Sequence, residues 1–303
     1  MVLLSWGRPP LRDVCHLPGE KICPQVRRGA RSHEVPGVSE LLLGRTTPSP
    51  ETYTPSVLHP IPRKRSPLVP YGHDFWRCYE LSWINSSGKP EVAICEVVYP
   101  VESTCIVESK SLKLYLNSFS QSRFASFKEV EETVFHDLRT ILDPEWIEVT
   151  IIPQERFPCL RWQETPDGIC IDRIDVSIDT FQPDPGLLLT EISPVQETLY
   201  SDLLRTLCPI TAQPDWASVI ISYAGPQIIH ASLLRYLCSF RHHSGFSEEC
   251  CEQIFTDIHH RCAPDRLEVR CCYTRRGGVD ITPLRSSAPV PRDSICSPRL
   301  IRQ

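Results

Sequence analysis

The sequence contains no apolar run long enough to cross a bilayer, so it predicts no membrane-spanning helix. It has no basic excess either: 32 Lys and Arg stand against 37 Asp and Glu, a net charge of −5, which argues against bulk binding of nucleic acid. The apolar stretch V-L-L-S-W at residues 2–6 is too short for a secretory leader. We therefore expect a cytoplasmic protein with no membrane partner and no direct nucleic-acid partner.

Two common site motifs are missing as well. No G-x-G-x-x-G occurs, which removes support for a Rossmann dinucleotide site, and the fifteen cysteines include no C-x-x-C. We expect reduced thiols, mostly buried as small apolar side chains. His259, His260 and Cys262 could join Cys271 and Cys272 in a zinc site, but this spacing matches no standard site, so we expect no bound metal.

The first 70 residues are rich in proline. Twelve of the 29 prolines fall there, and no hydrophobic periodicity accompanies them. We expect residues 1–40 to be a disordered extension and residues 41–70 to be an extended segment that lies on the fold. The basic cluster R-K-R at 63–65 could contact nucleic acid, although a solvated turn is the simpler interpretation.

Beyond residue 70 the pattern becomes a mixture of strands and helices. Apolar residues recur at helical spacing from Phe127 to Leu142 and predict a helix there. β-Rich runs predict strands at residues 75–84, 92–99 and 147–152. This part of the chain is therefore expected to form an α+β fold.

An internal repeat organises the same region. Three blocks recur in the same order at offsets of 120–124 residues, and each copy predicts a strand–strand–helix–helix–strand unit. The matched pairs include Tyr99 with Tyr223, Tyr115 with Tyr236, and Asp137 with Asp257. We divide the chain into a first module at residues 71–190 and a second at residues 191–303.

The two copies do not carry the same polar residues. Glu108-Ser109-Lys110 of the first copy aligns with Ile229-His230-Ala231 of the second. Cys208 lies in the second copy only. Chemistry that needs both sets requires them to meet, so we expect a site at an interface between modules, either within the chain or across a homo-oligomer.

The stretch L-C-P-I-T-A-Q-P-D-W at 207–216 places Cys208 on a proline-held loop and Asp215 at the start of an apolar strand. A nearby carboxylate raises the pKa of a thiol, so Asp215 would move protons rather than activate the cysteine. Spacing alone favours the plainer interpretation of a buried cysteine and an aspartate at a strand start.

A second candidate stretch surrounds Glu108. Its carboxylate could bind a ligand N–H group while Lys110 and Lys113 meet a phosphate. A carboxylate at a helix N-terminus is, however, ordinary dipole complementation, and taken alone that interpretation is the stronger one.

Two further stretches lie in the second copy. Glu248 and Glu249 open a predicted helix for which Ser247 is the expected N-cap. The sequence Arg275-Arg276-Gly277-Gly278 can bring guanidinium groups and backbone N–H groups to a phosphate. A hairpin end with solvated arginines is the alternative.

In combination, five stretches resemble one family closely: the NADPH-dependent 7-cyano-7-deazaguanine reductases, in their long, two-module form. They are Y-E-L-S-W (79–83), E-S-K-S-L-K-L-Y-L-N-S-F (108–119), C-P-I-T-A-Q-P-D-W (208–216), L-R-Y-L-C-S-F-R-H-H (234–243) and Y-T-R-R-G-G-V-D-I (273–281). The E-S-K-S-x-K-L-Y pattern is the family's own signature. The resemblance covers about residues 43–303.

This resemblance implies a fold and an activity. The fold would be the tunnelling fold (T-fold), with tandem modules whose antiparallel sheets carry helices on one face and which assemble as a homodimer or a higher homo-oligomer. The activity would be the reduction of the nitrile 7-cyano-7-deazaguanine to 7-aminomethyl-7-deazaguanine by two NADPH, on the route to the tRNA base queuosine. Cys208 would add to the nitrile carbon as a covalent thioimide, and Asp215 would donate the proton.

The resemblance also implies the binding residues. Those implied for the substrate are Val107, Glu108, Ser109, Ser247 and Glu248. Those implied for NADPH are Ser109, Lys110, Arg276 and Gly277.

One position departs from the family pattern. The family usually has F-H-E where this chain has Phe246-Ser247-Glu248, and serine cannot carry a charge near neutral pH. We expect an active enzyme that is slower or has a shifted pH profile. The alternatives are a catalytically impaired or silent T-fold relative that binds a deazapurine or purine, and a zinc-dependent cyclohydrolase-like T-fold enzyme.

Overall fold

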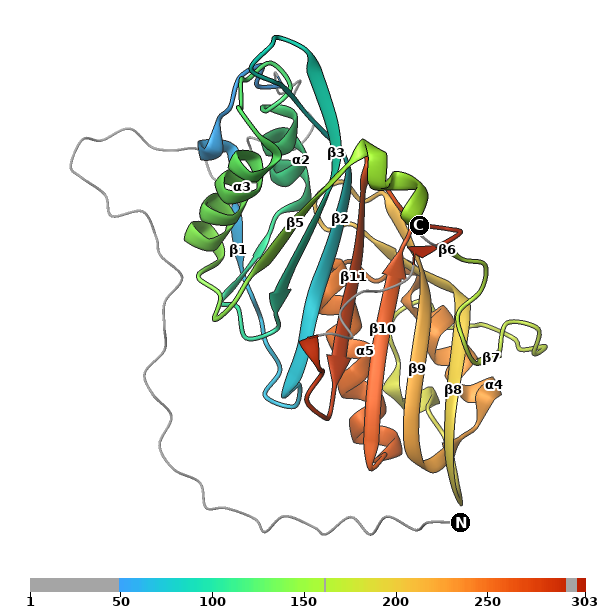
Figure 1. Ribbon diagram of the computed structural model, residues 1–303. Coiled ribbons are helices and arrows are strands. Elements are labelled where there is room, and N and C mark those ends of the chain that lie inside the picture. The colour runs from blue at the N-terminus through green and yellow to red at the C-terminus, as the bar shows by residue number, and fades with distance from the viewer. Residues whose placement is uncertain (1–48, 161, 293–298) are drawn as a thin grey trace, which may run out of the picture.

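One twisted eight-stranded sheet runs through the molecule (Figure 1). The computed structural model describes residues 49–160, 162–292 and 299–303, so the predicted extension at 1–40 lies outside the described residues. The strand order is β5-β3-β2-β11-β10-β9-β8-β7, and only the short β7–β8 pairing is parallel. The strands are β2 (Tyr71–Ile84), β3 (Pro90–Pro100), β5 (Glu148–Pro153), β7 (Ile169–Cys170), β8 (Thr190–Leu207), β9 (Pro214–Ile228), β10 (Arg266–Tyr273) and β11 (Val279–Ser286).

Helices cover this sheet in two pairs (Figure 1). The first pair packs on the β5-β3-β2 part of the sheet, and the second pair packs on the β8-to-β11 part. The helices are α2 (Ser109–Asn117), α3 (Phe127–Leu142), α4 (His230–Cys238) and α5 (Ser247–Cys262). The short elements are η1 (Pro55–Val57), β1 (Pro60–Pro62), β4 (Cys105–Val107), η2 (Gln154–Cys159), β6 (Trp162–Gln163), η3 (Pro185–Leu187), η4 (Ser239–His242) and β12 (Arg299–Leu300). The α+β prediction is confirmed.

Helix α3 shows why the local prediction succeeded. Its buried residues are Val130, Val134, Leu138 and Leu142, which lie at helical spacing on one face. The helix begins after Ser126, whose hydroxyl accepts the Glu129 N–H at 3.1 Å, and it ends where Asp143 takes a left-handed conformation. The predicted range 127–142 is confirmed.

The internal repeat is visible as repeated hydrogen bonds. The Tyr115 hydroxyl donates to Asp137 Oδ2 at 2.5 Å in the first copy, and the Tyr236 hydroxyl donates to Asp257 Oδ2 at 2.6 Å in the second. Both copies have the predicted order of elements: β2-β3-α2-α3-β5 and β8-β9-α4-α5-β10. The matched residues therefore fix the same packing of the first helix of each pair on the second.

Strand β11 joins the two copies into one sheet. It pairs with β10 on one side and with β2 on the other, both antiparallel. The two hydrophobic cores therefore lie side by side on one continuous support. The module boundary at residues 190 and 191 falls at the first residues of β8, and the T-fold assembly stays a prediction.

The segment before β2 packs on the first copy. Tyr53 makes edge-on ring contacts with Phe119 and Phe124, at centroid distances of 5.2 and 5.9 Å, and its hydroxyl donates to Asp137 Oδ2 at 2.7 Å. The described part of the predicted extended segment therefore lies on the fold. The solvated turn expected at 63–65 is wrong for Arg63, because the Arg63 side chain is only 3% exposed and forms an ion pair with Asp74.

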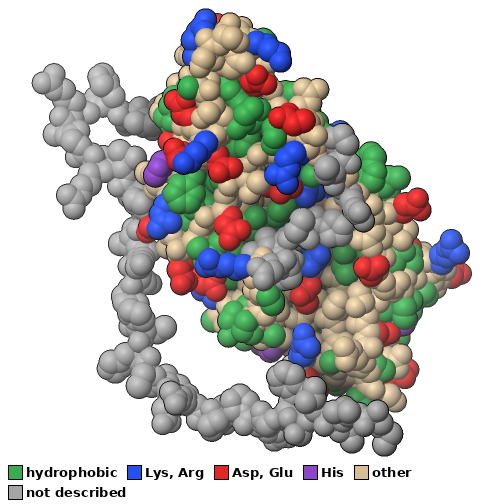
Figure 2. Space-filling model, viewed as in Figure 1, with side chains coloured by type: hydrophobic (Ala, Val, Ile, Leu, Met, Phe, Trp, Pro, Cys, Tyr) green, Lys and Arg blue, Asp and Glu red, His purple; other side chains and the backbone are tan. Residues whose placement is uncertain are grey.

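The charged side chains and the cysteines of the described residues agree in most respects with what the composition predicted. On the face seen in Figure 2, basic and acidic side chains are interspersed. Nine of the free cysteines among the described residues are buried, and Cys170 is exposed. Cys105 is disulfide-bonded, so the expectation of reduced thiols fails there. No helix among the described residues is long and apolar enough to cross a membrane.

We predict that Tyr53 secures the segment before β2. Tyr53→Ala should lower the free energy of unfolding by about 2–3 kcal/mol, because the ring contacts are lost. Tyr53→Phe should cost about 0.5–1.5 kcal/mol, for the hydrogen bond to Asp137 alone. Urea unfolding measures both. Tyr71→Ala, at a residue that is 38% exposed, is the control, and equal stabilities for all three variants would contradict the prediction.

Candidate active site

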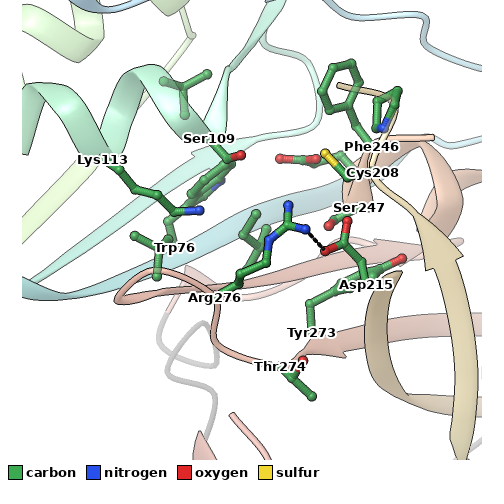
Figure 3. A pocket seen from close by; sticks show the side chains of 15 residues that line it. Trp76, Ser109, Lys113, Cys208, Asp215, Phe246, Ser247, Tyr273, Thr274 and Arg276 are labelled. Carbon is green, nitrogen blue, oxygen red and sulfur yellow. Dashed lines mark ion pairs between the residues drawn. The ribbon is translucent and has the colours of Figure 1, made fainter. Parts of the chain in front are cut away.

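A pocket lies where the two copies meet on the helix-covered side of the sheet (Figure 3). Including the open solvent at its mouth, it encloses about 530 Å³ of empty space. The first copy contributes Trp76 from β2, Val107, and Ser109 and Lys113 from α2. The second copy contributes Cys208, Pro209, Asp215, Phe246, Ser247, Glu248, Tyr273, Thr274, Arg276, Val279 and Ile281.

Most of the residues predicted for the site lie in this pocket. Seven of them line it: Val107, Ser109, Cys208, Asp215, Ser247, Glu248 and Arg276. The other three, Glu108, Lys110 and Gly277, lie next to lining residues in the chain but do not line the pocket themselves. Of the two arrangements that the sequence left open, the structure shows that the two sets meet within one chain.

The loop from Cys208 to Asp215 is held by its own backbone. The Cys208 N–H donates to the Gln213 carbonyl, and the Ala212 N–H donates to the Cys208 carbonyl, each at 2.9 Å. Ala212 has a left-handed conformation, with φ of 54°. These bonds curl the loop around the sulfur and bring Cys208 and Asp215 to the same pocket.

The loop also lowers the pKa of Cys208. Burial alone raises the pKa of this thiol, but hydrogen bonds from the Thr211 hydroxyl, from the N–H groups of Ile210 and Thr211, and from Arg276 outweigh it and hold the pKa below its ordinary value. Donors of this kind stabilise a thiolate. Cys208 is thus a buried cysteine whose surroundings favour its nucleophilic form, which distinguishes it from a cysteine buried for packing.

The pKa of Asp215 moves in the opposite direction. Burial raises the pKa of this carboxyl, against the opposing influence of Arg276 and Lys113. Arg276 Nη1 lies 3.1 Å from Asp215 Oδ1 (Figure 3). Asp215 is therefore held by an arginine beside Cys208 and retains its proton more readily than an exposed aspartate does.

Glu248 is the most deeply buried carboxyl in the pocket. It is 3% exposed, and among the described residues its Oε1 has no hydrogen-bond partner. Burial, followed by the neighbouring Asp74 carboxylate, raises the pKa of Glu248 to about 8. An unpartnered buried polar atom that lines a pocket indicates a ligand group that completes it.

Ser247 is not the N-cap that the sequence predicted. The cap position belongs to Phe246, whose N–H donates to the Glu249 carboxylate at 3.3 Å. Ser247 is therefore the first residue of α5 and lines the pocket. Glu249 provides the capping contact, and the serine side chain remains available to a ligand.

Glu108 has a structural role in this structure. It is the N-cap of α2, where Oε1 accepts the Lys110 N–H at 2.9 Å and Oε2 accepts the Ser111 N–H at 2.7 Å. This is the dipole complementation that the sequence favoured. Its substrate-binding role stays a prediction.

Lys113 lines the pocket, although the sequence did not predict it among the cofactor-binding residues. Ser109 and Lys113 are four residues apart and lie on the same face of α2, whereas Lys110 is rotated by about 100°. Burial, and then repulsion from Arg276, lowers the pKa of Lys113. The i,i+4 spacing was the signal that could have selected Lys113 over Lys110.

Two other contributors were not identified from the sequence. Trp76 lines the pocket while only 1% exposed, and within the described part of the chain its indole Nε1 has no hydrogen-bond partner. The Thr211 hydroxyl contributes by donating a hydrogen bond to the Cys208 sulfur, which lowers the pKa of that thiol. The described residues contain no group of three or more His, Cys, Asp or Glu arranged to hold a metal ion.

Comparison with known proteins gives two family matches. Residues 49–151 match the family described as "Nitrile reductase, 7-cyano-7-deazaguanine-reductase N-term", and residues 214–290 match the family "QueF-like protein". The matched ranges contain the pocket residues of the first copy and, apart from the Cys208 loop, those of the second.

Curated relatives match over most of their length. A protein of Burkholderia ambifaria is 48% identical over 259 residues, which cover 82% of this chain and 94% of the relative. A protein of Coxiella burnetii is 45% identical over 257 residues, which cover 82% of this chain and 91% of the relative. Both carry the name NADPH-dependent 7-cyano-7-deazaguanine reductase.

We predict that the Thr211 hydroxyl sets the reactivity of Cys208. Thr211→Val removes a donor to the thiolate, so the pKa of Cys208 should rise and alkylation by iodoacetamide should shift to higher pH. Mass spectrometry of the Cys208 peptide measures the rate at each pH. Thr211→Ser keeps the hydroxyl and should retain the original profile. Coincident profiles for the valine and serine variants would refute the role.

Proposed function

The chain belongs to the family of NADPH-dependent 7-cyano-7-deazaguanine reductases, and from this premise we propose that its pocket reduces the nitrile of 7-cyano-7-deazaguanine to the primary amine. The observation that supports it best is the meeting of Cys208, Asp215 and Glu248 with residues of the first copy in one pocket. The product, 7-aminomethyl-7-deazaguanine, is then a precursor of the tRNA base queuosine.

The first step is addition of Cys208 to the nitrile. The sulfur lone pair forms the C–S bond, and one C≡N π pair moves to the nitrogen. A thiolate is a strong nucleophile, and the donors that lower the pKa of Cys208 keep it available. The product of this addition is a covalent thioimide on Cys208.

Asp215 supplies the proton that this step requires. The nitrogen gains negative charge as the C–S bond forms, so an acid must lie within reach. Burial raises the pKa of Asp215, which helps the carboxyl to hold a proton until that moment. Arg276, at 3.1 Å from Asp215 Oδ1, stabilises the carboxylate that remains.

Glu248 orients the substrate. A guanine-like edge carries adjacent N–H donors that one carboxylate can accept in pairs, and Glu248 Oε1 is a buried acceptor with no partner among the described residues. A site built to pair such groups rejects analogues that lack them by a factor on the order of 10⁴. Ser247 and Val107 line the same pocket.

The pocket also fits a phosphate-bearing cofactor. Burial, and then repulsion from Arg276, lowers the pKa of Lys113, and an anion bound beside both side chains relieves that repulsion. We assign Lys113 to this role together with Ser109, Lys110, Arg276 and Gly277. Bound NADPH supplies hydride to the C=N bond, twice per nitrile.

Assembly and location are part of the same proposal. We expect a homodimer or a higher homo-oligomer of T-fold modules that acts in the cytoplasm on a small-molecule substrate. The alternatives, a silent relative that binds a purine and a zinc-dependent cyclohydrolase, gain no support from the relatives named above, because both carry the reductase name.

We predict two NADPH oxidised per amine formed. Cys208→Ala should abolish turnover, because no other group in the pocket can form the thioimide. NADPH absorbance and mass spectrometry of the product and of the Cys208 peptide are the measurements. An adduct on Cys208 without turnover would place the defect at hydride transfer. Neither adduct nor turnover in the unaltered chain would favour the silent relative.

We also predict that Ser247→His changes the rate. A histidine at this position could carry a proton, and acid–base groups contribute roughly 10²–10⁴ in rate, so we expect faster turnover or a shifted pH profile. Ser247→Asn, a polar substitution that does not titrate near neutral pH, is the control. If the rate and pH dependence of Ser247→His match those of the unaltered chain, the prediction is wrong and Ser247 does not slow the enzyme.

A further inference from the structure

Behind Glu248 lies a buried network of charges that the proposed chemistry does not use. Arg285 Nη1 lies 2.8 Å from Asp74 Oδ1, and Arg63 forms an ion pair with the other oxygen of Asp74. Arg285 Nε lies 3.6 Å from Glu252 Oε2, one turn along α5 from Glu248. The side chains of Asp74 and Arg285 are 0% exposed.

Arg285 also contacts Glu248 itself, but through the backbone. Its Nη2 donates to the Glu248 carbonyl at 3.3 Å, so the arginine fixes the first turn of α5 without pairing with the side chain. The backbone N–H of Ser66 donates to Glu252 Oε1, which ties the segment before β2 into the same network. The network therefore positions Glu248 while the two arginines are directed elsewhere.

The charges in this network balance without Glu248. Arg63 and Arg285 contribute two positive charges, and Asp74 and Glu252 contribute two negative charges. An ionised Glu248 would add a third negative charge in a region with no further counter-ion in the network, and burying an unpaired charge is costly.

Other titratable groups around the network and the pocket do not change this balance. From β2, His73 is neutral near pH 7, because burial lowers its pKa to about 4. From β3, Tyr99 is neutral, because burial, and then Glu248 and Asp74, raise its pKa. In the pocket, Asp215 is paired with Arg276, and Cys208 and Lys113 are further lining residues.

We propose that burial against the charge-balanced Arg63–Asp74–Arg285–Glu252 network leaves the Glu248 carboxyl protonated in the free protein, so that binding of the deazapurine releases one proton from Glu248 to the solvent. Asp74 is the positioning residue, since its carboxylate opposes ionisation of Glu248 in addition to burial, while Arg63 and Arg285 favour it. The inference rests on the proposed function, because it takes a guanine-like edge as the ligand.

The balance of the step is simple. A neutral carboxylic acid exposes one donor and clashes with one of the two N–H donors of a guanine-like edge, whereas a carboxylate accepts both. Binding therefore replaces one O–H bond of Glu248 by two N–H···O contacts, and the buffer accepts the proton. Affinity should rise about tenfold from pH 6 to pH 7 and level off above pH 8.

Calorimetry with full-length Cys208→Ala and 7-cyano-7-deazaguanine tests the proposal, because the variant binds without forming the thioimide. Binding heats measured at each pH in two or more buffers that are effective at that pH and differ in ionisation enthalpy give the number of protons released. We expect about 0.9 proton per bound substrate at pH 7 and about 0.1 at pH 9.

The role of Asp74 is tested in the same background. Asp74→Asn removes a negative charge beside Glu248, so proton release at pH 7 should fall and the pH profile should move to lower pH. Asp137→Asn makes the same change at an aspartate on α3 that is bonded to Tyr53 and Tyr115, and it should leave the profile in place. If Asp74→Asn does not fold, the pH series of Cys208→Ala alone decides.

The outcomes separate this inference from the proposed function. Binding with no proton release at pH 7 would overturn the inference and leave the function intact. Absence of binding in Cys208→Ala while the unaltered enzyme turns over would also overturn it, since the inference requires recognition without the thiol. Absence of both binding and turnover would remove the proposed function, and the inference with it.

Discussion

The pairing of β11 with β2 is the contact on which the rest of the structure depends. Each copy of the repeat has its own core, and the pocket is lined by residues from both copies. By adding β11 between β10 and β2, the chain makes one sheet of two and aligns the N-termini of α2 and α5 across it. The pocket is thus a property of the junction between the two copies.

Local patterns in the sequence predicted local structure well, because α3 and the repeated Tyr–Asp bonds depend on residues close in the chain or matched between copies. The resemblance selected the loop of Cys208 and the helix start at Glu248. What could not be predicted follows from long-range pairing: whether the copies meet within the chain, and that Arg63 is buried against Asp74. The sequence offered Lys110 and Lys113 together as phosphate contacts, and the resemblance assigned only Lys110 to NADPH, although Lys113 is the lysine that lines the pocket.

The surroundings of the pocket reduce the difference between the pKa values of Cys208 and Asp215. Hydrogen-bond donors lower the pKa of Cys208, and burial raises the pKa of Asp215. The two pKa values are therefore closer to each other than those of a free thiol and a free carboxyl in water. Proton movement between such groups and a substrate nitrogen needs little uphill transfer. Burial raises the pKa of both Asp215 and Glu248. The exclusion of water from the pocket therefore affects both the proton donor of the reaction and the carboxyl that recognises the substrate.

The place of β11 in the chain has a consequence for biosynthesis. Residues 71–153 contain β2, β3, β5, α2 and α3 and can pair as they leave the ribosome, but the β2 edge stays open until Val279–Ser286 emerges more than 190 residues later. Until then β2 presents unpaired N–H and C=O groups along a strand rich in aromatic residues, a template for wrong partners. During this long interval of synthesis, the strand that will lie in the middle of the sheet is open to association with wrong partners. The β10–β11 hairpin then closes that edge and completes the pocket.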